Sequence, residues 1–99
     1  MEQLPVACSL TPGALEARRS GLLAELIGRA ASREGLLDGH RLRFGADDLP
    51  LVTRTIDAER QCCRFLRFTL TVEPDGGPVV LDLTGPPGTS EFLSALFDA

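Results

Sequence analysis

The sequence predicts an α+β fold: a two-layer sandwich in which helices pack on a small, mostly antiparallel sheet, in the order βαβαββα. Short runs in which apolar residues alternate with polar ones predict the strands, and longer amphipathic runs between them predict the helices. A turn rich in proline and glycine separates the two clearest strands. The 99 residues are expected to form a single domain, 1–99, large enough to bury its own core.

The first expected elements are a short strand and a long helix. Val6, Cys8 and Leu10 alternate with small or polar residues, which is typical of a strand with one buried face. Cys8 is therefore expected to point inward. Pro12 suits the first turn of a helix, and the apolar spacing after it predicts a helix over residues 12–32.

A second strand and a second helix follow. In His40–Phe44 apolar residues alternate with arginine, so this run is expected to form a strand that is entered through a turn. An aspartate, either Asp47 or Asp48, is expected to cap the next helix. The apolar spacing carries that helix to the adjacent pair Cys62 and Cys63.

An antiparallel hairpin is the clearest structural prediction. Arg67–Glu73 and Val79–Thr84 both alternate with period two, and Pro74–Pro78 supplies turn residues between them. After a second turn, Thr89 is expected to cap a last short helix whose apolar residues, including Phe92, dock on the core.

Composition and charge argue against two classes of partner. The net charge of -4 and the pI near 4.8 disfavour nucleic-acid binding, which rests on clustered basic residues. No apolar run approaches the ~20 residues that cross a bilayer, so no membrane partner is expected. The first residues lack the basic and apolar regions of a secretory signal, which predicts a cytoplasmic location with reduced thiols.

The three cysteines carry the main functional signal. Three thiols cannot all pair within one chain, so a disulfide framework explains them poorly. Cys62 and Cys63 cannot easily oxidise to each other, because adjacent Cα atoms lie ~3.8 Å apart and disulfides usually need ~4.4–6.8 Å. A partner from elsewhere in the chain is more plausible, and Cys8 is the other thiol.

The position of the pair near a helix C-terminus favours metal ligation over nucleophilic attack. The helix macrodipole places partial negative charge there, which disfavours a bare thiolate but favours a cation held by thiolates. Two or three sulfur ligands suit soft ions, of which Hg(II), Cu(I) and As(III) best fit the three cysteine thiols of this chain. Zn(II) normally takes four ligands, so it would also need His40 or Glu59.

The stretch Glu59–Phe68 has the pattern Glu-x-x-Cys-Cys-x-Phe-x-x-Phe, and Cys8–Pro12 reads Cys-Ser-Leu-Thr-Pro. Together these segments resemble small bacterial proteins associated with heavy-metal, particularly mercury, resistance. The resemblance spans nearly the whole chain, including the closing strand and helix. It implies that Cys62 and Cys63 capture the metal, with help from Cys8.

These observations lead to one main hypothesis and two alternatives. The main hypothesis is a cytoplasmic protein that captures or relays a soft metal ion without turnover, requires no cofactor, and functions in metal resistance. Cys62 and Cys63 would be the primary ligands, Cys8 the third, and Glu59 a proton acceptor. A homodimer or another metal-resistance protein is the expected partner. The alternatives are a thiol redox enzyme or sensor in which Cys8 resolves, and a non-catalytic interaction or sensing module with structural cysteines.

Several residues also have ordinary structural interpretations. Cys8 can be a small buried hydrophobe in its strand. Glu59 and His40 are expected to face solvent, and Phe65 to anchor the core. Gly85–Thr89 imitates the start of a phosphate-binding loop, but no Gly-Lys-Ser/Thr ending follows, so a nucleotide site is not expected.

Overall fold

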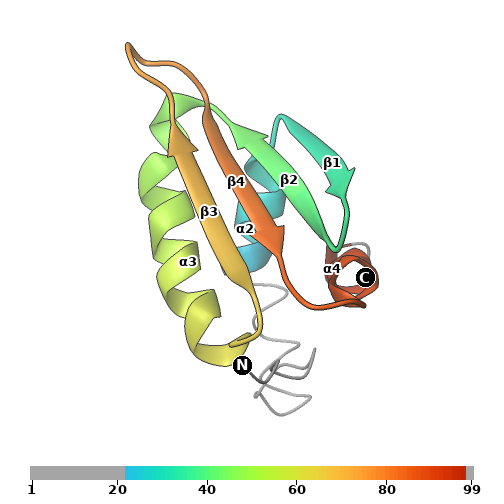
Figure 1. Ribbon diagram of the computed structural model, residues 1–99. Helices are drawn as coiled ribbons and strands as arrows, with labels where there is room; N and C mark the ends of the chain where they lie inside the picture. Colours follow the sequence, from blue (N-terminus) through green and yellow to red (C-terminus); the bar gives the residue numbers. More distant parts are fainter. Residues whose placement is uncertain (1–21, 98–99) are drawn as a thin grey trace.

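The computed structural model describes residues 22–97 of the chain, and the strand expected at 6–10 lies outside these residues. A four-stranded antiparallel sheet has the order β1-β2-β4-β3 and carries α2 and α3 on one face (Figure 1). No helix within residues 22–97 lies across its other face, which is called the open face below. This arrangement confirms the predicted α+β, two-layer fold. The elements are α2 (Leu22–Arg29), β1 (Ser32–Leu36), β2 (Gly39–Phe44), the 3-10 helix η1 (Ala46–Asp48), α3 (Leu49–Cys62), β3 (Arg67–Val72), β4 (Val79–Thr84) and α4 (Thr89–Phe97).

The predicted end of the first long helix is wrong. α2 stops at Arg29, and β1, which the sequence did not predict, occupies residues 32–36. β1 is almost entirely exposed and is held by pairing with β2, from Ser32 opposite Arg43 to Leu36 opposite Gly39. Because an exposed edge strand is stabilised by backbone pairing and not by burial, it carries no period-two pattern of apolar residues.

The predicted hairpin of β3 and β4 is confirmed, and β1 and β2 form a second hairpin that the sequence did not predict. β1 and β2 are joined by a turn in which Asp38 has a φ of 58°, and β3 pairs with β4 from Arg67 opposite Thr84 to Val72 opposite Val79. In the second turn Asp75 and Gly76 take φ values of 60° and 70°. Asp and Gly tolerate this left-handed conformation better than other residues do, which is why they mark the turns.

The core lies between the sheet and the helices. β4 has a strictly alternating burial pattern, and its inward residues face those of β2 across the antiparallel register. The helices add buried residues from behind this pair of strands. Among the described residues, the buried cluster of this core consists of Leu26, Leu42, Phe44, Leu51, Val52, Val79, Leu81, Leu83 and Leu93.

α2 and α3 run antiparallel. Arg29, at the end of α2, lies with its Nη1 3.6 Å from Oδ1 of Asp48, at the start of α3. Asp48 occupies the N-cap position as expected, but its side chain makes no capping hydrogen bond. The aspartate therefore links two helices, and Pro50 lies in the first turn as the sequence predicted. The start of α2 consequently points toward the end of α3 that leads into Cys63.

Candidate functional site

The paired cysteines lie where α3 ends. Cys62 is the last helical residue, and Cys63 is the C-cap, with φ -106° and ψ 71°. The N–H of Cys63 still donates to the Glu59 carbonyl at 2.8 Å, but the backbone turns away from the helix there. The Cys63 side chain is 1% exposed, so this sulfur belongs to the interior.

Glu59 lies beside the Cys63 thiol. Its Oε2 is 3.8 Å from Sγ of Cys63 and accepts a hydrogen bond from the thiol. The expectation that Glu59 faces solvent is wrong, because only 5% of the residue is exposed. Leu51, Thr55 and Glu59 follow one another at four-residue intervals along the buried side of α3, and this spacing carries the carboxylate inward.

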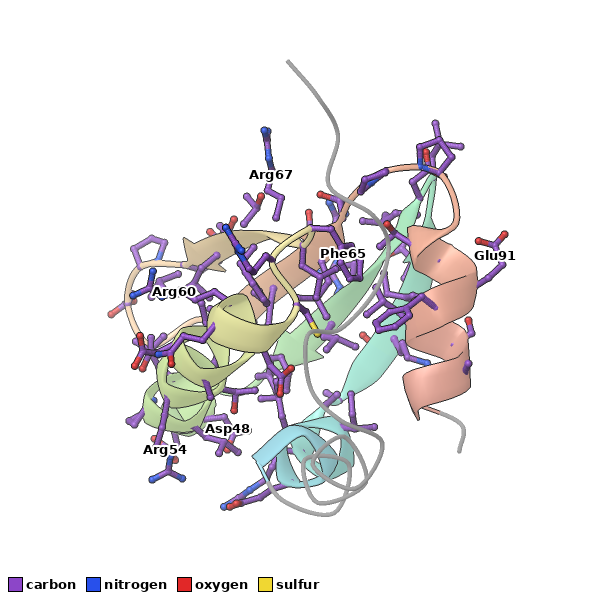
Figure 2. All side chains as sticks on the ribbon, turned by 90° about the horizontal axis from the view of Figure 1, so that it is seen from below. Asp48, Arg54, Arg60, Phe65, Arg67 and Glu91 are labelled. Carbon is purple, nitrogen blue, oxygen red and sulfur yellow. The ribbon has the colours of Figure 1, made fainter. Side chains whose placement is uncertain are left out.

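An aromatic pair covers the thiol on the side of α4. Phe65 and Phe92 meet edge to face, with ring centroids 5.1 Å apart and an interplanar angle of 85°. Phe65 is buried, as predicted, packs in one cluster with Cys63, and lies between the end of α3 and α4 (Figure 2). On the far side of α4, Glu91 points outward (Figure 2). The rings therefore exclude water from the neighbourhood of Cys63.

The loop before α4 packs closely against the start of that helix and against Phe65. A Cβ added at Gly85 would lie 2.6 Å from the Thr89 hydroxyl and 3.2 Å from the Phe65 carbonyl, so only glycine allows this approach. The Thr89 hydroxyl is buried and donates to the Pro86 carbonyl at 2.6 Å, and α4 begins at Thr89 itself. This hydroxyl is engaged with its own loop, which gives no support to a phosphate site.

His40 is buried and contacts α4, so the expectation that it faces solvent is wrong. Its Nε2 lies 3.2 Å from the Ser90 carbonyl and 3.2 Å from the Ser94 hydroxyl. Whether Nε2 donates or accepts in these two contacts depends on the tautomer of the ring. His40 anchors α4 to β2 and is not a candidate fourth ligand beside the cysteines.

The described residues supply part of the predicted metal site. They bring Cys63 and Glu59 together and put Cys62 next in sequence at the helix end, whereas Cys8 lies outside them. Within residues 22–97, no group of three or more His, Cys, Asp or Glu side chains gathers to hold a metal ion. The burial of Glu59 could have been found from its four-residue spacing with Leu51 and Thr55.

No protein-family model, curated protein or solved structure matches this chain. None of the helices in the described part of the chain combines the length and apolar character needed to cross a membrane.

Proposed function

We propose that this protein captures or relays a soft metal ion, Hg(II) first among them, through cysteine thiolates in metal resistance. Cys62 and Cys63 are the primary ligands and Cys8 is the third. The observation that carries the proposal is the buried contact between Cys63 and Glu59, a thiol hydrogen-bonded to a carboxylate at the end of a helix.

The chemistry of this helix end suits a bound cation. The macrodipole of α3 and the Glu59 carboxylate both place negative charge near the Cys63 sulfur, which favours a cation and disfavours an unaccompanied thiolate. The aromatic cover lowers the local dielectric, which strengthens these electrostatic interactions. Thiolate is the preferred donor for Hg(II), Cu(I) and As(III), and two or three sulfurs satisfy such ions.

The antiparallel packing of α2 and α3 supports a role for Cys8. The ion pair between Arg29 and Asp48 joins the ends of the two helices that lie far from Cys63, so Leu22, the first described residue of α2, lies on the side toward Cys63. Cys8 precedes Leu22 by 14 residues, which span ~21 Å even when fully helical. This length matches the ~21 Å of the 14-residue helix α3.

The burial of Cys63 favours capture over redox catalysis. An attacking thiolate needs an accessible sulfur and a positive environment. Cys63 is 1% exposed and faces a carboxylate at a helix C-terminus. A metal ion can exchange between sulfurs one ligand at a time, whereas an external disulfide attacked by Cys63 would have to reach this buried sulfur.

A competition experiment tests the proposal. The reduced protein is mixed with one equivalent of Hg(II) and a competing small thiol, and native mass spectrometry follows the metal-bound fraction. We expect a 1:1 complex that C62S/C63S abolishes and C8S weakens, with circular dichroism confirming that each variant is folded. Retention of Hg(II) by folded C62S/C63S at the wild-type affinity would refute the proposal.

A further inference from the structure

The two edges of the sheet differ in how well they resist pairing with another strand. β1 is protected by the charged and glycine residues Arg33, Glu34 and Gly35. β3 reads Arg-Phe-Thr-Leu-Thr-Val, with one charge at its first residue and strong strand formers after it. Such an unprotected edge is a surface for strand addition. Among the described strands, β3 pairs with β4 alone, and it lies at the outer edge in Figure 1 with α3 behind it.

The hydrogen-bonding groups that β3 presents outward can be identified from its pairing with β4. The N–H of Glu73, directly after β3, donates to the Pro78 carbonyl at 3.2 Å. Because antiparallel residues alternate between bonding one neighbour and facing the other, Phe68, Leu70 and Val72 direct their N–H and C=O groups to the open edge. Val72 is also 53% exposed, which is high for a large apolar residue.

We propose that β3 pairs antiparallel with β3 of a second copy of this chain, with a twofold axis at Leu70. In this register Leu70 faces its own counterpart and Phe68 faces Val72 of the second copy, so all the outward backbone groups are used. Thr69 then faces Thr71 on the open side of the sheet. The joined sheet carries the α3 helices of both copies behind the shared strands.

Charge complementarity selects this register. Counting outward from Leu70, Arg67 of each copy falls opposite Glu73 of the other, so the dimer contains two opposite-charge pairs. Arg67 and Glu73 are exposed and have no ion-pair partner among the described residues. Arg67 points away from the helices, toward the open face (Figure 2). A shift of the register by one residue would break both charge pairs and turn the second sheet over, so that the Phe68 side chains of the two copies would lie on opposite faces.

Sedimentation velocity over a range of concentrations tests the dimer, with charge reversal as its internal control. R67E and E73R each place like charges opposite one another. Each should raise the dimer dissociation constant about tenfold, because both Arg67–Glu73 pairs of the dimer are lost. R67E/E73R restores opposite charges and should return the constant to near the wild-type value. A double variant as weak as the single ones would overturn the register.

The backbone contribution is tested at Val72. V72P removes an outward N–H while leaving the β3–β4 ladder intact, so it should abolish the dimer without unfolding the chain. V72T keeps the N–H and should still dimerise.

A disulfide across the interface tests the register. Mixing T69C chains with T71C chains should give a disulfide between these positions that neither variant forms alone, identified by peptide mass spectrometry. Wild-type protein that is monomeric at all concentrations would refute the dimer. If the wild-type protein were monomeric and V72P lowered its melting temperature, the outward N–H of Val72 would be bonded within the chain. Another segment of the same chain would then occupy the outer edge of β3.

Discussion

Glu59 and Cys63 form a buried contact at the end of α3. The Cys63 thiol donates a hydrogen bond to Oε2 of Glu59 at 3.8 Å, and both residues are almost completely buried. A carboxylate in this position places negative charge beside the sulfur. In the proposed metal site, this charge would favour a cation bound to the Cys63 sulfur.

Replacing Glu59 by glutamine tests this interpretation. E59Q keeps the shape of the side chain but removes its charge, so a cation at the thiols should be held about tenfold more weakly. D57N is the matched control, because Asp57 is exposed on the same helix and should leave Hg(II) affinity unchanged. A competition titration with a small thiol measures both. Equal affinity in E59Q and the wild type would mean that Glu59 does not act on the metal site.

Arg41 and Asp82 form the main ion pair of the open sheet face. They lie directly opposite each other in β2 and β4, with Nε of Arg41 2.8 Å from Oδ1 and Nη2 3.0 Å from Oδ2 of Asp82. The hydrogen bonds from Arg41, reinforced by its charge, lower the pKa of Asp82 below its ordinary value. Arg41 remains charged throughout, so Asp82 determines the pH dependence of the pair.

Acid should therefore weaken this pair. The folded-state pKa of Asp82 is depressed, so the stabilisation is complete above the unfolded value of about 3.9 and is lost as pH falls through the folded pKa. D82N should lower the free energy of unfolding at pH 7 but have little effect at pH 2, measured by urea denaturation at both. A difference of the same size at the two pH values would contradict this assignment.

At the scale of elements, Gly39 allows a close approach between β2 and β4. A Cβ at this position would overlap the Leu83 carbonyl and lie 2.9 Å from Cγ2 of Thr84. Gly35, in β1, has open space where a Cβ would be added. The same substitution at the two glycines thus separates crowding from the general properties of glycine in a strand.

G39A should destabilise the protein by about 3 kcal/mol, because the β2–β4 backbone must move apart. G35A should be neutral or slightly stabilising, since alanine loses less conformational freedom on folding. Thermal or urea denaturation of both variants provides the comparison. If G39A were as stable as G35A, the close approach of the two strands would not exist in solution.

The aromatic cover from α4 should control access to Cys63. F92A removes one ring of the edge-to-face pair, so the thiol should react with N-ethylmaleimide at least about tenfold faster through local opening. L37A is the control, because Leu37 is 92% exposed and remote in sequence from the thiol. Peptide mass spectrometry separates modification at Cys63 from that at Cys62. Unchanged labelling of Cys63 in F92A would show that Phe92 does not shield it.

The elements differ in how well the sequence predicts them, and burial explains the difference. The β3–β4 hairpin was predictable because one buried face imposes strict alternation on β4. β1 was not, because it is exposed and its pairing with β2 leaves no pattern of side-chain types. His40 and Glu59 were wrongly expected to face solvent, because both are polar residue types that are usually exposed. The residue type does not reveal that α4 covers His40 or that Glu59 lies on the buried side of α3.

At the scale of the whole molecule, the two proposed surfaces are separate. The thiols lie where α3 ends and α4 packs, whereas the dimer axis passes through Leu70 in the middle of β3. In the proposed dimer the two Arg67 residues would be ~20 Å apart along the paired strands, and Cys63 precedes Arg67 in each chain. We therefore propose that each chain completes its own metal site, with Cys8 of the same chain as the third ligand.

It follows that metal stoichiometry should not depend on dimerisation. We expect one Hg(II) per chain both in the wild type and in V72P, with equal affinities, because the edge of β3 contributes no ligand. Native mass spectrometry across protein concentrations measures this. One ion per two chains, lost in V72P, would instead mean that the metal bridges the copies.

The most direct test of the metal-binding account is X-ray absorption at the mercury edge for the 1:1 complex with reduced protein. We predict a first shell of sulfur alone in the wild type, with three sulfur neighbours, two in C8S, and no more than one protein-derived sulfur, that of Cys8, in C62S/C63S. A shell of oxygen or nitrogen neighbours in the wild type, or a sulfur shell that survives replacement of Cys62 and Cys63, would contradict the account.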